Sequence, residues 1–236
     1  MRLLVTRPEP DGARTAAVLR ARGHDVMLAP LLRIETVPNA NLGPGPWAAI
    51  LITSANGARA AAEHSRCQEL LALPVMAVGR SSAEAARAAG FANVASAEGD
   101  GRDLVRHVAA RFIGSSAPLL YLAGEDRARD LTGELGAFGV AVRSAVVYRA
   151  VKATSLPADT RAALAAGRID AVVHFSGRSV EAYLDCTHEI AGLALAPAHY
   201  CLAARAAEPL RVAGAAQIRV AARPDEAALL DLIGTA

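Results

Sequence analysis

The sequence predicts an α/β protein with parallel sheets, and two observations support this prediction. Short strands that are apolar on both faces alternate with helical patterns along the whole chain of 236 residues. Such strands are typical of parallel sheets that helices cover on both faces. In addition, three strand–helix units occur twice in the same order. An internal repeat of this kind predicts two similar lobes.

The expected elements begin with a strand at residues 2–8 and a helix at 11–24. An apolar stretch at 26–37 follows, and residues 38–47 are rich in Pro, Gly and Asn, which favours a loop. Further strands are expected, with helical patterns between them, at residues 47–54, 74–79, 94–97, 118–124, 140–151, 171–176, 199–204 and 218–222.

The repeat aligns the two halves of the chain without gaps inside each unit. Its matched segments are 2–26 with 118–142, 49–64 with 171–186, and 74–97 with 198–221. An alanine-rich α/β chain also matches itself by composition, but the shared order and the matched glycines favour a duplication. Ser54 then stands opposite Ser176, and both follow a strand. Two lobes enclose a cleft, and ligands of open α/β sheets bind outside the carboxyl ends of the strands.

Composition argues against several classes of function. Apolar residues make up 53% of the chain and charged residues 20%, as in a packed globular protein. The aromatic content of 4% is low for a protein that stacks single-stranded bases, and a net charge of +2 is small for a polyanion binder. We therefore expect no nucleic-acid partner.

The cysteines and the apolar runs predict the compartment. Three cysteines, widely spaced and without a C-x-x-C motif, suit a reducing environment. The apolar run at the start is too short for a signal peptide. No run reaches the roughly 20 residues that a membrane-spanning helix needs. The sequence thus predicts a cytoplasmic protein without a membrane partner.

Hydroxyl-bearing turns follow two of the expected strands. In VGRSSAEAA, Gly79 precedes a helix that opens near Ser82, and Thr53 and Ser54 lie in a similar turn. A hydroxyl there either caps the helix or belongs to an anion site at its N-terminus. A P-loop is excluded because the only lysine, Lys152, lies elsewhere.

Two further stretches hold candidate site residues. Glu125 and Asp126 are expected at a helix start, where negative charge is stabilised, and Arg127 after them is either solvated or directed at a carboxylate. Tyr148 lies in a long strand pattern, where it either packs or serves as a weak proton donor. The six histidines show no metal-ligand spacing, and His174 is expected in the core or at a cleft edge.

Taken together, these stretches resemble the uroporphyrinogen-III synthase family over nearly the whole chain. The stretches that resemble it, in the family's order, are LLVTRPEPDG, LITSANGARA, AVGRSSAEAARAAGF, LLYLAGEDRARDL, VVYRAV, HFSGRSVEAYL and EPLRVAG.

The resemblance implies two similar flavodoxin-like parallel-sheet lobes joined by a two-stranded connector. One lobe is then discontinuous, with residues 1–35 plus 152–236, and the other spans 36–151. The connector strands are expected near 31–37 and 146–152. The repeat alone divides the chain near Ser115 instead. Both divisions agree if the first strand–helix unit of each half packs in the other lobe.

The resemblance also implies a reaction, the cyclisation of hydroxymethylbilane to uroporphyrinogen III with inversion of ring D and loss of water. The family is a group of cyclising lyases of heme and tetrapyrrole biosynthesis and uses no metal or organic cofactor. The leaving hydroxyl sits beside an electron-rich pyrrole and departs readily, so that a weak acid suffices. The harder task is to hold the chain for attack at the substituted carbon, which is catalysis by positioning.

Carried over to this sequence, the catalytic residue is Tyr148, which assists the loss of hydroxide. The implied substrate-binding residues are Thr53, Ser54, Asn56, Gly79, Ser82, Arg127, Ser176 and Arg205. The chain departs from the family at two of these places. Asn56 stands where a basic residue is often found. Ala203–Ala206 lacks the glycine and hydroxyl of a G-x-x-[TS] turn, so that either Arg205 supplies the missing contact to a carboxylate or this subsite is lost.

We further expect a monomer that binds no metal and meets hydroxymethylbilane synthase transiently. The alternative function is a non-enzymatic two-lobe binding module for an anionic small molecule. A nucleotide-sugar or NAD enzyme would need a glycine-rich phosphate loop after a strand, and the sequence has none.

Overall fold

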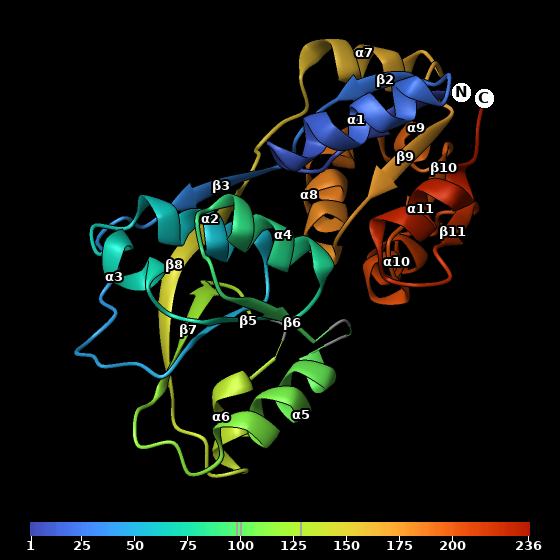
Figure 1. Cartoon of the computed structure of the whole chain (residues 1–236). Coiled ribbons are helices and arrows are strands. Elements are labelled where there is room, and N and C mark those ends of the chain that lie inside the picture. Colours follow the sequence, from blue (N-terminus) through green and yellow to red (C-terminus); the bar gives the residue numbers. More distant parts are fainter. Residues whose placement is uncertain (98, 100, 128) are drawn as a thin grey trace. The chain divides into compact units, whose positions relative to one another are not determined.

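A computed structural model describes residues 1–97, 99, 101–127 and 129–236. The chain forms two compact units. Unit 1 consists of Met1–Arg33 with Val151–Ala236, and unit 2 of Ile34–Ala150. Each unit contains its own sheet with helices packed on it (Figure 1). The predicted α/β fold with parallel sheets is therefore confirmed.

Unit 1 is built on a five-stranded parallel sheet in the order β11-β10-β9-β1-β2. Its strands are β1 (Arg2–Val5), β2 (Asp25–Leu28), β9 (Ala171–His174), β10 (Ala198–Cys201) and β11 (Ile218–Val220). Its helices are α1 (Asp11–Ala21), α7 (Ala158–Ala165), α8 (Gly177–Thr187), the 3-10 turn η1 (His188–Ile190), α9 (Ala191–Ala194), α10 (Ala204–Val212) and α11 (Glu226–Ile233). Side chains of α7, α8 and α9 pack on one face of this sheet and those of α1 and α11 on the other.

Unit 2 is built on a six-stranded sheet in the order β3-β8-β7-β4-β5-β6. Its strands are β3 (Leu32–Thr36), β4 (Ile50–Ile52), β5 (Val75–Ala77), β6 (Val94–Ser96), β7 (Leu119–Gly124) and β8 (Val142–Lys152). Its helices are α2 (Ala55–Glu63), α3 (Cys67–Leu71), α4 (Arg80–Ala88), α5 (Gly101–Phe112) and α6 (Leu131–Gly136). None of the helices in the described residues of either unit is long and apolar enough to cross a membrane.

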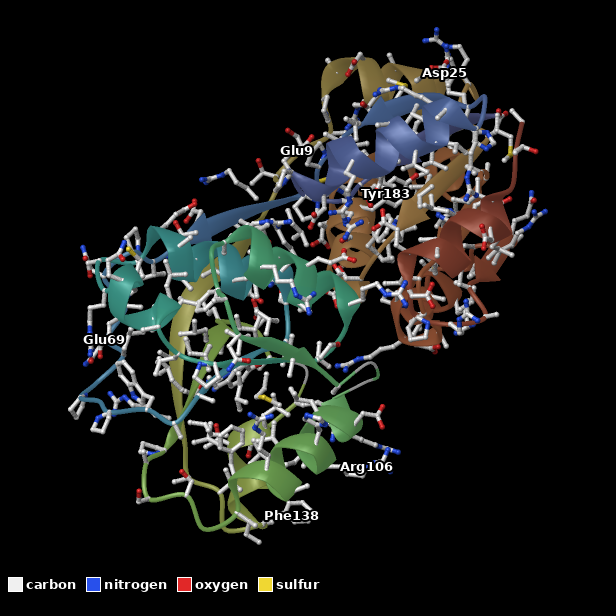
Figure 2. The ribbon with its side chains drawn as sticks, viewed as in Figure 1. Glu9, Asp25, Glu69, Arg106, Phe138 and Tyr183 are labelled. Atoms are coloured by element: carbon white, nitrogen blue, oxygen red, sulfur yellow. The ribbon has the colours of Figure 1, made fainter. Side chains whose placement is uncertain are left out.

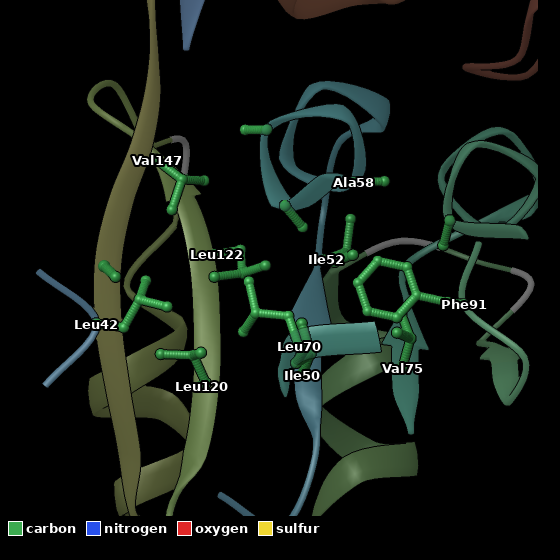
Figure 3. Packing of buried hydrophobic residues seen from close by; sticks show 14 of the residues in the cluster. Leu42, Ile50, Ile52, Ala58, Leu70, Val75, Phe91, Leu120, Leu122 and Val147 are labelled. Carbon is green, nitrogen blue, oxygen red and sulfur yellow. The ribbon is translucent and has the colours of Figure 1, made fainter. Parts of the chain in front are cut away.

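Side chains of unit 2 alternate between two apolar layers. Ile50 and Ile52 of β4 face α2, α3 and α4 (Figure 3). Leu51 between them faces α5 and α6. Small residues bring α2 close to the sheet, because a Cβ on Gly57 would lie 2.9 Å from the carbonyl oxygen of Leu122. The apolar periodicity of the strands thus fixes which helices cover which face.

The sequence repeat agrees with the pairing register of both sheets. Leu4 pairs with Val172 in unit 1, and the matched residues Leu120 and Ile50 pair in unit 2. The other three strand pairs agree in the same way. In unit 1 the paired residues are Leu3–Val26, Val172–His199 and His199–Ile218. Their matches in the repeat, which pair in unit 2, are in the same order Leu119–Val142, Ile50–Val75 and Val75–Val94. Residues matched in sequence therefore occupy matched places in the two sheets, as expected of a duplication.

The repeat and the compact units divide the chain at different points. The repeat breaks near Ser115, but both compact units combine strands from the two halves of the chain. The first unit of each half, β1-α1-β2 or β7-α6-β8, pairs with strands of the other half. A division at Ser115 is therefore wrong for the compact units, because strand pairing and not chain order decides where the core lies.

A cluster of buried polar rings lies inside unit 1. His174 and His199 are fully buried, and their Nε2 and Nδ1 atoms lie 3.2 Å apart. Both rings contact Tyr183 edge-on, and this side chain of α8 is also fully buried (Figure 2). The Thr6 hydroxyl lies 3.5 Å from Nδ1 of His174. His174 thus belongs to the core, one of the two places expected from the sequence.

Burial keeps both histidines neutral. It lowers the pKa of His174 well below the usual value, and the neighbouring His199 ring lowers it further. Burial also lowers the pKa of His199 to about 4. The Ala194 carbonyl opposes that shift in the pKa of His199, although Nε2 of His199 makes no hydrogen bond of good geometry to any described residue. The folded chain therefore takes up fewer protons than the unfolded chain in mildly acidic solution.

This difference predicts a loss of stability on acidification. An unfolded histidine binds a proton below about pH 6.5, while these two remain neutral until lower pH. Their contribution to the free energy of unfolding is therefore complete above about pH 6.5 and is lost progressively toward about pH 4. Between pH 7 and pH 4.5, the free energy of unfolding of His199→Gln should fall by about 1 to 3 kcal/mol less than that of the wild type. Urea unfolding at the two pH values measures this difference. The exposed His107 provides the control His107→Gln. An unchanged acid sensitivity in His199→Gln would contradict this account.

Candidate functional site

The candidate site residues gather at the carboxyl edge of the sheet in each unit. In unit 2 they follow β4, β5 and β7 or lie on β8, and they are Thr53, Ser54, Asn56, Gly79, Ser82, Arg127 and Tyr148. In unit 1 they follow β9 and β10, and they are Ser176 and Arg205. Because β4, β5, β7 and β8 run parallel in unit 2, and β9 and β10 run parallel in unit 1, these ends meet at one edge of each sheet. The structure therefore brings together the candidates of each unit, as the strand pattern predicts.

Ser54 uses its hydroxyl to hold its own turn. It is the N-cap of α2, and its Oγ accepts a hydrogen bond of 3.2 Å from the N–H of Asn56. The Asn56 side chain in turn accepts a hydrogen bond of 2.9 Å from Arg59 through Oδ1. The first turn of α2 is thus stabilised by local side chains, as the capping interpretation of this motif expects.

Thr53 is held by a residue that the sequence patterns did not single out. Its Oγ1 lies 3.0 Å from the hydroxyl of Tyr121 on β7. Tyr121 is buried among apolar residues that include Leu104 and Leu131. A buried phenol needs a hydrogen-bond partner, and Thr53 supplies one here. The signal in the sequence is a lone tyrosine in the otherwise apolar run LLYLAG.

The first turn of α4 differs from that of α2. Its N-cap is Gly79 in an extended conformation, with no side-chain cap from the described residues. Ser82 is buried in the first turn, after the N-cap. The N-cap position is therefore occupied by Gly79 and not by a serine. The helices α2 and α4 pack against each other, so the capped and the uncapped helix starts are neighbours (Figure 1).

Arg127 lies in a loop and not at a helix start. Helix α6 begins only at Leu131, where Asp130 is the N-cap and accepts a hydrogen bond of 3.0 Å from the N–H of Gly133. The predicted helix start at Glu125 and Asp126 is therefore wrong, because the capping carboxylate lies further along the chain. Arg127 is exposed, and its Nη1 donates a hydrogen bond of 3.0 Å to the Ser144 hydroxyl on β8.

Tyr148 is half-buried on β8, beside the last residue of β7. Its ring lies so close to Gly124 that a Cβ at that position would be 2.7 Å from Cζ and 2.9 Å from the hydroxyl oxygen. Its backbone carbonyl accepts a hydrogen bond of 3.0 Å from the N–H of Glu125. The phenol therefore sits at the carboxyl edge of the sheet, over the end of the buried central strand.

In unit 1 the two candidates lie on adjacent helix starts. Ser176 is the N-cap of α8, and its Oγ accepts a hydrogen bond of 3.1 Å from the N–H of Ser179. Arg205 is exposed in the first turn of α10, whose N-cap Ala203 provides no side-chain cap. A Cβ on Gly177 would lie 3.7 Å from the carbonyl oxygen of Arg205. One capped and one uncapped helix start thus lie side by side, as in unit 2.

Arg7 is a further charged residue at this edge that the sequence patterns did not single out. It follows β1, and its guanidinium lies 4.3 Å from the centre of the Phe175 ring, next to Ser176. Its Nη1 is 2.9 Å from the Glu226 carboxylate, and Asp11 is 3.7 Å away. Arg7 therefore ties the end of β1 to α1 and α11. Its position in RPEPDG gave no sign of the distant Glu226.

A hollow of about 320 Å³ lies at the opposite edge of unit 1. Its lining residues are Arg2, Asp25, Met27, Asp159, Ala162, Ala163 and Arg168. Arg2 and Asp25 form an ion pair there at 2.7 Å. Arg2 and Asp25 begin β1 and β2, so this hollow is at the amino ends of the strands, away from Ser176. Among the described residues, no three His, Cys, Asp or Glu side chains are grouped to hold a metal ion.

The two kinds of serine predict different effects of substitution. Ser54→Ala and Ser176→Ala remove a helix cap, so each should lower the free energy of unfolding by about 1 kcal/mol. Ser82→Ala removes no cap and should lower it by about 0.5 kcal/mol or less. Urea unfolding of the three variants at pH 7 measures the difference. An equal loss in all three would show that the Ser82 hydroxyl also supports the fold.

Comparisons with known proteins agree with this arrangement. The family model described as uroporphyrinogen-III synthase HemD matches residues 13–231. The crystal structure of uroporphyrinogen-III synthetase from Helicobacter pylori superposes with a TM-score of 0.68 at 19% identity, over 99% of this chain and 98% of that one. A mutant uroporphyrinogen III synthase from Thermus thermophilus gives 0.55 at 18% identity, over 95% and 94%. No match is found among curated protein sequences. Because the family model covers most of its length, the chain belongs to the uroporphyrinogen-III synthase family.

Proposed function

We propose that this chain performs its family's ring closure with Tyr148 as the proton donor, while the carboxyl edges of its two units hold the carboxylates of the substrate. Membership of the family makes it a cyclising lyase of tetrapyrrole biosynthesis that acts on hydroxymethylbilane. The observation that supports the residue assignment best is the position of the Tyr148 phenol at the carboxyl edge, over Gly124.

The chemistry of the substrate makes a phenol sufficient. The leaving hydroxyl sits on a carbon beside an electron-rich pyrrole, and donation from the pyrrole nitrogen expels it. A phenol with an ordinary pKa near 10 is a weak acid at neutral pH, which suits a leaving group that needs little help. The phenol donates its proton to the departing oxygen, and loss of water leaves an azafulvene-like cation. We propose that the chain then holds this cation for attack at the substituted carbon of the last ring.

Two uncapped helix starts support a role in carboxylate binding. The N-termini of α4 and α10 have no side-chain cap from the described residues, and N–H groups at a helix start are suited to binding an anion. Arg205 lies exposed in the first turn of α10, and Arg127 lies exposed on the loop after β7. Ser54 and Ser176 are already engaged as caps, so we assign them the role of shaping the turns.

We propose that the two units act as two lobes, residues 1–35 plus 152–236 and residues 36–151, joined by β3 and β8 as a connector. Once the repeat is taken into account, the five repeated strands of each sheet have the order of flavodoxin-like folds. The duplication gives each unit its own sheet with an equivalent carboxyl edge. That the chain works as a cytoplasmic monomer and meets hydroxymethylbilane synthase transiently remains a prediction.

The first test removes the phenol hydroxyl. Tyr148→Phe should lower kcat about a hundredfold, since a positioned proton donor contributes at least about that much, and it should leave the unfolding midpoint nearly unchanged. Turnover is measured on fresh hydroxymethylbilane, with the III isomer separated from the I isomer that forms without enzyme.

The control is a tyrosine that is fully buried inside unit 1. Tyr183→Phe removes a hydroxyl that donates a hydrogen bond of 2.8 Å to Ala194 inside unit 1. It should lower stability and leave kcat within about twofold, because a single internal hydrogen bond contributes about 1 kcal/mol to stability. Full activity of Tyr148→Phe would remove the proton-donor role. Tight binding of the bilane by the wild type without turnover would favour the anion-binding module instead.

The second test concerns the departure from the family at residues 203–206. Arg205→Gln should raise KM about twofold to fivefold with kcat unchanged, because an exposed ion pair contributes up to about 1 kcal/mol. The effect should fade as salt is added. Arg211→Gln on the same helix is the matched control, since Arg211 already pairs with Glu208 at 3.0 Å. An equal KM for both variants would show that this turn does not contact the substrate.

A further inference from the structure

An irregularity in the sheet determines the direction of the Tyr148 side chain. Strands β7 and β8 pair in register up to Ala123 and Val146, but the next pair is Gly124 with Tyr148. Strand β8 therefore contains one extra residue, Val147, opposite the end of β7. An extra residue of this kind is a β-bulge, which turns the side chains that follow it toward the other face of the sheet.

The bulge places two consecutive side chains on one face. Val147 is buried in the apolar layer under α2 and α4, and Tyr148 packs against the same layer. In a regular strand Tyr148 would share a face with Val146, which is 37% exposed. Hydrogen bonds fix the bulge on both sides. The carbonyl of Val147 accepts from the N–H of Val37 at 2.8 Å, and that of Tyr148 accepts from Glu125.

Gly124 provides the space that the turned ring occupies. A Cβ at this position would lie 2.7 Å from Cζ, 2.9 Å from Cε2 and 2.9 Å from the hydroxyl oxygen of Tyr148. The backbone of Gly124 does not adopt positive φ, so an alanine is compatible with the backbone itself. The glycine therefore matters here through the ring above it and not through its own conformation.

We infer that Gly124 and the bulge at Val147 are positioning elements for the Tyr148 phenol, so that replacing Gly124 moves the proton donor without removing it. This inference rests on the proposed role of Tyr148 as the proton donor. A side chain at position 124 displaces the ring end by direct contact, and a displacement of about 1 Å lowers the rate of a positioned reaction by up to about a hundredfold. The carboxylate-binding surfaces are untouched, so kcat falls while KM does not.

The experiment is a double-mutant cycle on hydroxymethylbilane turnover. Gly124→Ala should lower kcat about tenfold to a hundredfold and leave KM within about twofold. In the Tyr148→Phe background the same change should lower kcat by less than about twofold, because no proton donor remains to be displaced. The matched control is Gly136→Ala in α6, where an added Cβ meets nothing within 4 Å and kcat should not change.

The possible outcomes separate the two claims. Wild-type kcat in Gly124→Ala, or an equal loss in both backgrounds, overturns the positioning role. Full activity of Tyr148→Phe overturns the proton-donor role itself, and with it the basis of this inference. A loss in Tyr148→Phe together with normal Gly124→Ala leaves the proposed function standing and removes only the role of Gly124.

A second variant covers the case in which Gly124→Ala does not fold. Adding Tyr148→Ala removes the ring that blocks the new Cβ, so the double variant should fold. Its urea midpoint of unfolding should equal that of Tyr148→Ala alone. Folding of the double variant shows that the ring is the obstacle and supports its confinement over Gly124. Failure of the double variant to fold would mean that the backbone requires the glycine, which contradicts the inference.

Discussion

The hydrogen-bonded pairing of β7 with β4 on one side and β8 on the other determines where the proposed site residues of unit 2 lie. All six residues of β7 are buried. Two of the proposed site residues contact it directly: Thr53 through the hydroxyl of Tyr121, and Tyr148 through its ring over Gly124. Helix α2 approaches the same strand over Gly57. A central strand buried on both faces cannot shift its register without exposing apolar side chains, so these attachments share a rigid reference.

Helix starts with and without a capping serine lie next to each other at the carboxyl edge of each sheet. In each unit one helix begins with a capping serine and its packed neighbour begins without a side-chain cap from the described residues. At the capped starts, the serine hydroxyl accepts a hydrogen bond from a backbone N–H of its own helix. At the other two starts, the positive end of the helix dipole would favour the carboxylates that we propose bind there. The duplication therefore repeats a pair of unlike helix starts and not a single motif.

Much of the fold could be predicted from the sequence, because it depends on periodic patterns. The alternation of apolar strands and helices predicted the α/β class, and the gapless repeat agreed with the register of four strand pairs in each sheet. Register is a matter of which side chains face the core, and that information is local to each segment. The loops after the strands were also identified, since a strand that ends in Gly, Ser or Thr before a helical pattern is easily recognised.

Contacts between distant segments could not be predicted in this way. The bulge at Val147 depends on how β7 ends, and the pairing of Tyr121 with Thr53 depends on two strands that lie far apart in the sequence. Helix α6 begins after Asp130 and not after Asp126, because the path of the loop decides which carboxylate caps the helix. The buried pair His174 and His199 likewise becomes visible only when β9 and β10 are placed together.

The central claim is that the chain selects its product by holding the substrate, while Tyr148 only assists the departure of the hydroxyl. The most direct measurement is the isomer composition of the product formed by Tyr148→Phe from fresh hydroxymethylbilane, after subtraction of closure without enzyme. The account predicts slow formation of uroporphyrinogen III, the isomer expected of the wild type. An excess of the I isomer in the enzyme-dependent product would contradict it, because the phenol would then control where the ring closes.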